Sequence, residues 1–256
     1  MSNRIQFSEI SYDKDLASYA CIQKARPLQS LAESDLTLTE FKLLDVYLAR
    51  IDSHRPEKRA VTIERGELEE LLGLSQIRKD DLNKRLRHLF QTVKVNDDNK
   101  RNGFILINLF EKAEAEQDEN GQWQITLTCT PSAREYVFNI ETIGYLRYRL
   151  KNVINLTSRY SYVLYLYVLD NKFRSKWKIS VEELKELLNC KAERYDVFKF
   201  FNAEIIKKSC MEINQKTDLR FTYKPIRKGR KIVEIEFTIC VVDGSGKMIQ
   251  ETRKEP

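Results

Sequence analysis

The feature that most constrains this chain is an internal repeat of a leucine-rich helix signature. Residues 68–74 read LEELLGL, and residues 184–190 read LKELLNC. The two copies lie 116 residues apart. This separation indicates duplication of a whole domain, because the units of a solenoid recur about every 20–50 residues. The chain has 256 residues, of which 42% are hydrophobic, and is long enough for two domains with a core each. We therefore expect two related domains in tandem.

Hydrophobic periodicity in the first half predicts helices and strands in a definite order. Thr39 is placed to cap a helix that ends near Pro56, and Gly73 closes a second helix. The predicted elements are helices 39–54, 68–74 and 78–90, and strands 60–63, 93–95, 104–110 and 123–130. The acidic segment 111–121 is predicted to be a loop or an extended hairpin tip.

The second half repeats this plan. Ser180 and Glu183 form a capping-box pattern at the start of a helix, and the turn 189–193 leads into a long helix. The other predicted elements are a helix over 158–173, a strand over 177–179, the end of the long helix near 214, and strands 219–225 and 231–240. A helix-turn-helix followed by a hairpin in each half predicts an α+β chain of two tandem winged-helix domains.

The predicted domain boundaries follow from these patterns. We expect an N-terminal arm over 1–30, a first winged-helix domain over 31–140, a second over 141–242 and a flexible tail over 243–256. The linker is expected within 139–144.

Charge is divided unevenly between the halves. Residues 1–140 carry 20 Lys and Arg against 23 Asp and Glu, whereas residues 141–256 carry 24 against 15. The halves therefore have net charges of −3 and +9. A phosphate backbone would be attracted first to the second half.

Two groups of side chains in the second half fit DNA contact. The first group lies at the start of the third helix, where Arg or Lys can read guanine and Asn can read adenine in the major groove. Its members are Lys191, Arg194, Tyr195, Lys199 and Asn202. A solvated helix face is the competing interpretation. The second group crowds a hairpin tip at Gly229 and consists of Lys224, Arg227, Lys228, Arg230 and Lys231. Five cations in eight residues repel one another unless an anion is near, which favours phosphate contact.

The corresponding helix of the first half carries both basic and acidic residues. Its candidate DNA-contacting residues are Arg78, Lys79, Asn83, Lys84 and Arg87. Asp80 and Asp81 accompany them, and acidic residues there are also explained by compensation of the helix dipole. DNA contact and a purely structural role both remain open for this helix.

Catalytic and cofactor chemistry finds little support. His54 and His88 are the only histidines, so no histidine-pair metal site can form, and a rolling-circle nickase is disfavoured. The five cysteines are widely spaced and are expected to be free thiols. Residues 244–247 (GSGK) lack the other positions of a phosphate-binding loop. We predict no enzyme activity, no cofactor and no metal.

Two further patterns have ordinary explanations. The tyrosines at 160, 162, 165 and 167 could stack on unpaired bases, but helical periodicity favours their packing in the core. No apolar stretch approaches the length of a membrane helix, and no signal-peptide pattern opens the chain. We expect a soluble protein of the bacterial cytoplasm without membrane contact.

An ordered series of short segments resembles the Rep_3 family of iteron-plasmid replication initiators. These segments are 144–148 (GYLRY), 156–161 (LTSRYS), 164–165 (LY), 179–184 (ISVEEL), 187–188 (LL), 195–198 (YDVF), 212–214 (EIN), 217–219 (TDL) and 228–231 (KGRK). The resemblance covers about residues 35–240 and is densest from 144 onward.

The resemblance implies a mechanism that residue spacing cannot supply. Members of the family bind directly repeated origin sequences, called iterons, as monomers. They help to open an adjacent A+T-rich segment, recruit the host initiator and helicase machinery, and often repress their own gene as homodimers. It further implies that the second domain reads most bases, through 191–202 and the hairpin 224–231, that Arg159 adds a phosphate contact, and that the first domain supports DNA contact and dimerisation. A winged-helix transcriptional repressor is the main alternative, and a DNA nickase is a third.

Overall fold

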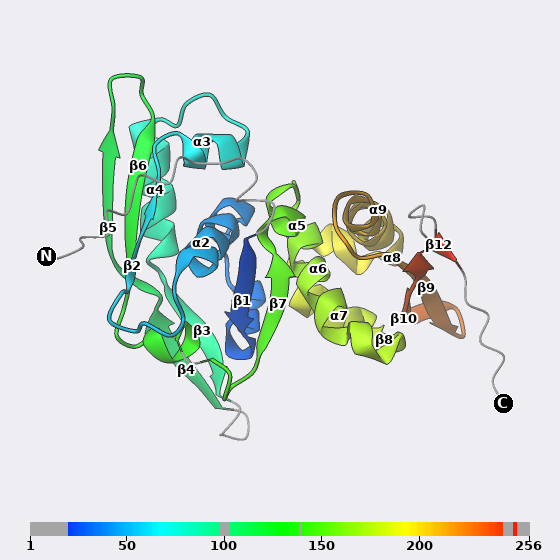
Figure 1. Ribbon diagram of the computed structural model, residues 1–256. Helices are drawn as coiled ribbons and strands as arrows, with labels where there is room; N and C mark the ends of the chain where they lie inside the picture. The colour runs from blue at the N-terminus through cyan, green and yellow to red at the C-terminus, as the bar shows by residue number, and fades with distance from the viewer. Residues whose placement is uncertain (1–19, 98–102, 139, 243–247, 250–256) are drawn as a thin grey trace, which may run out of the picture.

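The computed structural model describes residues 20–97, 103–138, 140–242 and 248–249. These residues form two lobes that lie side by side, with β1 (Cys21–Ala25) and β7 (Tyr145–Arg149) between them (Figure 1). The last described residues, β11 (Val241–Val242) and β12 (Met248–Ile249), form a small antiparallel pair. The GSGK segment 244–247 and most of the expected tail lie outside the described residues.

The segment 20–33 is part of the first lobe rather than an arm, which corrects the sequence expectation. Here β1 pairs antiparallel with β7, and the 3-10 helix η1 (Arg26–Glu33) follows. Four apolar side chains of the segment are fully buried: Ile22, Ala25, Leu28 and Leu31. The partner of β1 is about 120 residues distant in the chain, so local periodicity could not reveal the pairing. Residues 1–19, the rest of the expected arm, lie outside the described range.

The first lobe contains the predicted helix-turn-helix and two sheets. Its elements are α2 (Leu38–Arg50), β2 (Ala60–Ile63), α3 (Glu67–Leu72), α4 (Lys79–Leu89), β3 (Thr92–Asp97), β4 (Gly103–Asn108), β5 (Phe110–Gln117), β6 (Trp123–Cys129) and η2 (Arg134–Tyr136). One sheet has the order β2-β6-β5, and β3 and β4 form a separate hairpin.

Local sequence explains where these elements begin and end. The N-cap of α2 is Thr37 rather than Thr39, because Glu40 closes a capping box by accepting the Thr37 backbone N–H at 2.7 Å. Helix α2 ends at Arg50, earlier than predicted, where its guanidinium donates to the carbonyl of Thr62. Gly73 adopts a left-handed conformation (φ +66°) after α3, as the sequence predicts for a C-terminal glycine.

Strand β5 occupies most of the segment 111–121, for which the sequence left a loop or an extended hairpin tip open, and the structure shows a long hairpin strand. It pairs with β6 from Phe110 to Gln117, with a register shift between Phe110 and Lys112, and a turn follows Gln117. Lys112, Glu114 and Glu116 alternate along β5 as exposed residues. Charged residues at every second position fit the alternation of a strand, but they add no apolar pattern by which a strand is recognised in the sequence. The composition of this segment alone therefore suggested a loop.

The second lobe repeats the architecture of the first. Its elements are α5 (Leu150–Ile154), α6 (Arg159–Asn171), η3 (Lys172–Arg174), β8 (Lys176–Ser180), α7 (Val181–Leu187), η4 (Glu193–Asp196), α8 (Phe198–Phe200), the π-helical η5 (Phe201–Ile206), α9 (Lys207–Lys216), β9 (Phe221–Lys228) and β10 (Lys231–Ile239). The sheet order β8-β10-β9 matches β2-β6-β5, with the first strand beside the last in both. Two tandem winged-helix domains are thus confirmed.

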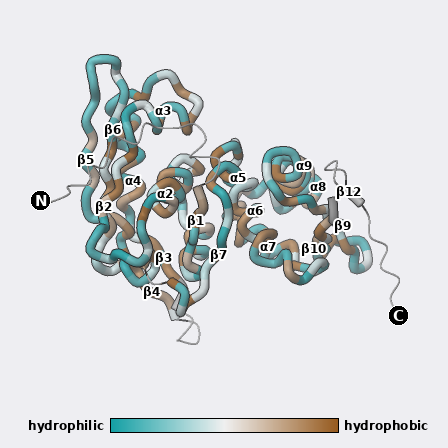
Figure 2. Tube along the Cα trace, in the orientation of Figure 1, coloured by the Kyte–Doolittle hydropathy of each residue, from teal (hydrophilic) through white to brown (hydrophobic). Residues whose placement is uncertain are grey.

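The core of the second lobe is aromatic. Tyr162 and Tyr165 are buried, which confirms their packing role, and the rings of Trp177 and Phe237 stack with centroids 5.6 Å apart. Figure 2 shows hydrophobic segments inside both lobes and hydrophilic segments on the β5–β6 hairpin tip and on outer turns of α9. Each domain therefore has an apolar interior beneath a charged surface, as the composition predicts.

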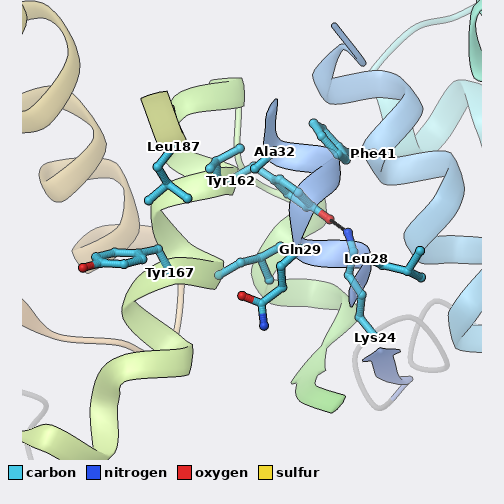
Figure 3. A pocket seen from close by; sticks show the side chains of 10 residues that line it. Lys24, Leu28, Gln29, Ala32, Phe41, Tyr162, Tyr167 and Leu187 are labelled. Atoms are coloured by element: carbon cyan, nitrogen blue, oxygen red, sulfur yellow. Dashed lines mark hydrogen bonds between the residues drawn. The ribbon is translucent and has the colours of Figure 1, made fainter. Parts of the chain in front are cut away.

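A buried polar network joins the two halves of the chain. Lys24 donates to the Tyr162 hydroxyl at 3.0 Å (Figure 3), and the hydroxyls of Tyr162 and Tyr148 donate to the two carboxylate oxygens of Asp45 at 2.8 and 2.9 Å. Burial lowers the pKa of Lys24 and raises the pKa of Asp45, while their mutual attraction opposes both shifts. The network links β1, α2, β7 and α6, so it holds helix α6 of the second domain against the first domain.

Arg159 also stabilises the junction between the two domains. Its guanidinium donates to the carbonyls of Ala32, Ser34 and Leu36 in the first domain at 2.7–2.8 Å, and to that of Leu188 in the second at 3.1 Å. These carbonyls use the donors that a phosphate would need. Arg159 therefore has a structural role at the domain junction, and the phosphate contact expected of it stays a prediction.

Candidate nucleic-acid interface

The long helix of the second domain begins later than the sequence suggested. Its first turn is α8, so Lys199 and Asn202 lie at the start of the helix. Lys191, Arg194 and Tyr195 instead lie in the turn before it, which includes the short 3-10 helix η4. Val197 stands between η4 and α8 in an extended conformation (ψ 106°) and interrupts the helix. The five candidates still gather at one end of the helix.

The segment that follows the first turn of this helix is wider than an α-helix. After α8, residues 201–206 form the π-helix η5, and α9 then continues to Lys216. Phe201, Ile205 and Ile206 are buried in the core, which fixes the inner face of this segment. Such π-helical turns are rare and concentrate at functional sites.

Arg194 is held by both charge and aromatic contacts. Its guanidinium pairs with the carboxylate of Glu204 one turn into the helix. It also lies 5.4 Å from the ring centroid of Phe200 and 5.9 Å from that of Tyr195. The side chain is 57% exposed. A fixed and accessible guanidinium fits a group that meets a base edge or a phosphate.

Two other candidates have partners within the protein. Lys191 pairs with Asp35 of the first domain at 3.2 Å, and both side chains are 72% exposed. Asn202 accepts a hydrogen bond at Oδ1 from the Tyr223 hydroxyl of β9 at 2.8 Å. Burial raises the pKa of Tyr223, so this hydroxyl stays protonated and keeps its donor. The bond fixes the amide of Asn202 relative to the hairpin. Lys199 is exposed between these groups.

The β9–β10 hairpin forms the wing. Gly229 supplies a left-handed residue (φ +64°) at its turn, and nothing lies within 4 Å of the position that a Cβ would take. The five wing cations, Lys224, Arg227, Lys228, Arg230 and Lys231, are all exposed. Lys228 is directly opposite Lys231 in the strand register, an arrangement of like charges that is unfavourable without a neighbouring anion.

The wing cations differ from the other cations of the same sheet. Lys176 pairs with Glu236 at 3.0 Å, and Lys178 lies 4.0 Å from Glu234. Within the described ranges, no wing cation has a carboxylate at ion-pair distance. The wing tip therefore concentrates positive charge that the described residues do not neutralise.

The first domain presents a second basic helix surface on α4. Its candidates, Arg78, Lys79, Asn83, Lys84 and Arg87, are all exposed. The Arg87 side chain donates to Asn83 Oδ1 at 3.1 Å. Beside them, His88 Nδ1 lies 2.6 Å from the buried Glu40, at the edge of a hollow that Lys84 and Arg85 also line. This surface is accessible to DNA, but its cations are interrupted by acidic neighbours.

Sequence reasoning missed two apolar members of the second domain's surface. Val197 falls within the long helix that the sequence predicts after residue 193, yet it is 53% exposed because it precedes the first helical turn. Phe200 is 40% exposed beside the fully buried Phe201. If the start of the helix had been known, the exposure of both side chains could have been predicted, because successive side chains of a helix point about 100° apart.

Two absences concern only the residues that the structure describes. Across those ranges, no three His, Cys, Asp or Glu side chains are grouped so that they could hold a metal ion. None of the described helices combines the length and apolarity that a membrane crossing requires.

Comparison with known families matches both domains. The family model described as "Initiator Replication protein, WH1" matches residues 22–169, and "Initiator Rep protein, WH2" matches residues 180–239. The boundary between the two models falls after α6, whereas the structural repeat places α6 with the second domain. No curated protein gives a significant match.

Two solved structures resemble the chain. A Pi initiator protein, crystallised in complex with iteron DNA, is 22% identical with a TM-score of 0.68, and the match covers 91% of this chain and 98% of that one. Domains 2 and 3 of RctB are 14% identical with a TM-score of 0.42, over 83% and 80% of the two chains. The likeness to the Pi initiator extends to the fold of both domains.

Proposed function

Because this chain belongs to the family of initiator replication proteins, we propose that it initiates plasmid replication by binding repeated origin DNA, the iterons. The observation that carries this proposal is the unneutralised wing beside the start of a π-widened helix. A phosphate backbone supplies the anions that the wing lacks, and the adjacent helix start supplies side chains for base edges. The Pi initiator, which has the same fold, was crystallised with iteron DNA.

The two parts of the interface divide the work. The wing cations contact phosphates and set the position of the domain on the duplex, without reading sequence. Arg194, Lys199 and Asn202 face the major groove and discriminate bases. Lys191 reaches a phosphate by exchanging its exposed partner Asp35 for the DNA, a change that costs little because exposed ion pairs are weak. The α4 surface of the first domain adds an auxiliary contact.

The first domain also supplies a homodimer surface. Phe104 and Leu106 of β4 are 58% and 60% exposed, and in the described part of the chain β4 pairs with β3 alone. An open strand edge with exposed apolar side chains fits pairing with the same edge of a second copy. The dimer represses the protein's own gene, and the monomer binds the iterons.

The remaining steps depend on partners. Bound to its repeats, the monomer promotes opening of an adjacent A+T-rich segment and recruits the host initiator and helicase machinery in the bacterial cytoplasm. The protein performs no catalysis itself and needs no cofactor or metal. Supercoiled origin DNA incubated with the pure protein and magnesium should therefore stay intact, and nicking would contradict this part of the proposal.

A footprint combined with a replication assay tests the proposed function. The full chain is footprinted on the DNA that flanks its own gene, and the same DNA is placed on a plasmid whose replication depends on the chain supplied in trans. We expect regularly spaced protected repeats and stable maintenance of the plasmid. A single protected promoter palindrome without maintenance would identify a repressor instead.

A further inference from the structure

The start of the DNA-facing helix in the second domain carries two exposed apolar side chains. Val197 is its N-cap residue, and Phe200 lies in its first turn. The neighbouring Phe201 is fully buried, so Phe200 is not a core residue displaced by local packing. Exposure of an aromatic ring and a branched side chain at one helix start is unfavourable in water and suggests a contact with another molecule.

Cationic side chains accompany these two residues on the same part of the domain. The Arg194 guanidinium lies over the Phe200 ring at 5.4 Å, and Lys199 is exposed between Val197 and Phe200 in sequence. The wing belongs to the same domain, and its five cations have no ion-pair partner among the residues that the structure describes. Charge complementarity therefore favours a polyanion over a protein partner as the molecule that covers the two apolar side chains.

The major groove of DNA offers one apolar group, the 5-methyl group of thymine. Phenylalanine and small aliphatic side chains contact it, while Arg, Lys and Asn contact the polar edges of other bases. We propose that Val197 and Phe200 each select an A·T pair in the recognised sequence by packing on a thymine methyl group. This inference rests on the proposed function, and it adds an apolar contact that the polar candidates cannot make.

The arrangement also gives Phe200 a second effect on base reading. Its ring packs beneath Arg194, while Glu204 holds the other side of the same guanidinium. Packing of the ring on a thymine would thus fix the direction of Arg194 toward the neighbouring base pair. Arg194 and Phe200 are expected to specify adjacent positions.

Replacement of thymine by deoxyuridine tests the inference. A duplex is first enriched from a random-sequence library by the full chain, and each thymine in turn is then replaced by deoxyuridine. Uracil pairs with adenine and keeps every polar group but lacks the methyl group. The unsubstituted protein should lose about fourfold in affinity at one or more positions, the ratio that corresponds to about 0.8 kcal/mol per buried methyl group.

Variants assign each position to a side chain. Phe200→Ala should bind the thymine duplex more weakly and should bind the thymine and deoxyuridine duplexes equally at its own position. Val197→Ala should do the same at a different position. Phe200→Leu keeps an apolar side chain and should retain part of the discrimination, and thermal unfolding of each variant checks the fold.

Phe173→Ala is the matched control. Phe173 is 75% exposed and lies just before β8, at the end of the sheet opposite to the wing tip. This variant should keep the full discrimination between thymine and deoxyuridine.

The outcomes separate the inference from the proposed function. If no sequence is enriched, the proposed function fails and the inference fails with it. If a sequence is enriched but no deoxyuridine substitution weakens binding, only the inference is overturned. It is also overturned if Phe200→Ala and Val197→Ala keep the discrimination of the unsubstituted protein, a result that would assign the two side chains to a protein partner.

Discussion

Replacement of Arg230 by alanine should flatten the salt dependence of DNA binding without changing the preferred sequence. Arg230 is exposed at the wing turn and has no ion-pair partner in the described part of the chain. Each cation that neutralises a phosphate contributes about 0.9 to the slope of log K against log salt. The five wing cations together would then account for a slope of about 4.5.

The size of the single change follows from the same relation. Loss of one phosphate contact lowers the slope by about 0.9, which corresponds to a difference of about 3.5-fold over the range from 50 to 200 mM salt. Fluorescence anisotropy with a labelled repeat duplex, titrated at several KCl concentrations, measures it. A scrambled duplex of equal length should show the same reduction in slope, because phosphate contacts are independent of sequence.

A matched control uses another cation of the same sheet. Lys176 pairs with Glu236 and lies at the end of the sheet away from the wing turn. Lys176→Ala should leave the slope unchanged. If Arg230→Ala binds with an unaltered slope, or if Lys176→Ala lowers the slope equally, the assignment of phosphate contact to the wing is refuted.

Three further predictions concern the framework of the molecule. Arg159→Ala should destabilise the protein by about 2–4 kcal/mol in denaturant unfolding, because four backbone carbonyls lose a charged donor, whereas Arg174→Ala on the exposed η3 should change stability little. Unchanged stability with weakened DNA binding would instead restore a phosphate contact to Arg159. Burial opposes the shift, but hydrogen bonds from Lys216 and Thr157 outweigh it and lower the pKa of Glu212 from 4.5 to about 2. Because the pKa is lower in the folded state, ionised Glu212 stabilises the protein above about pH 4.5, and this stabilisation is lost as the pH falls toward 2. Glu212→Gln should therefore reduce the dependence of Tm on pH in this interval. An unchanged dependence of Tm on pH would contradict this assignment. Leu106→Lys should shift the dimer toward monomer in sedimentation equilibrium while leaving binding to a single repeat intact, and an unchanged dimer would exclude β4 as the interface.

Features set by local sequence were predictable. The capping box of Ser180 and Glu183, the left-handed Gly73 and the hairpin turn at Gly229 each depend on residues a few positions apart. The repeat of the leucine signature likewise identified the duplication that the two sheet orders display.

Features set by distant contacts were not predictable. The pairing of β1 with β7 and the network around Asp45 depend on segments more than 100 residues apart, so residues 20–33 resembled an arm. Arg159 looked like a surface cation, and only the fold shows the carbonyls that surround it. Local periodicity predicts whether a segment is a helix or a strand and roughly where it lies in the sequence. The contacts of its polar groups depend on residues that are distant in the sequence.

The candidate interface has one part that was predictable from the sequence and one part that was not. The wing charges were evident from composition, since a hairpin tip is exposed in any winged helix. The helix start was not, because Val197 continues the apolar period of the helix yet stands outside its first turn. As a result, the sequence pattern did not show that Val197 and Phe200 are exposed beside the polar candidates.

The division of work between helix and wing is the central claim, and comparison of binding profiles tests it most directly. Sequence preferences are measured for the unsubstituted chain, Lys199→Ala and Arg230→Ala against every single-base change in one repeat. Lys199→Ala should lose discrimination at one position by about 1–3 kcal/mol, whereas Arg230→Ala should weaken binding to all sequences alike. If Arg230→Ala alters the preferred bases and Lys199→Ala does not, the helix does not read the repeat and the account is contradicted.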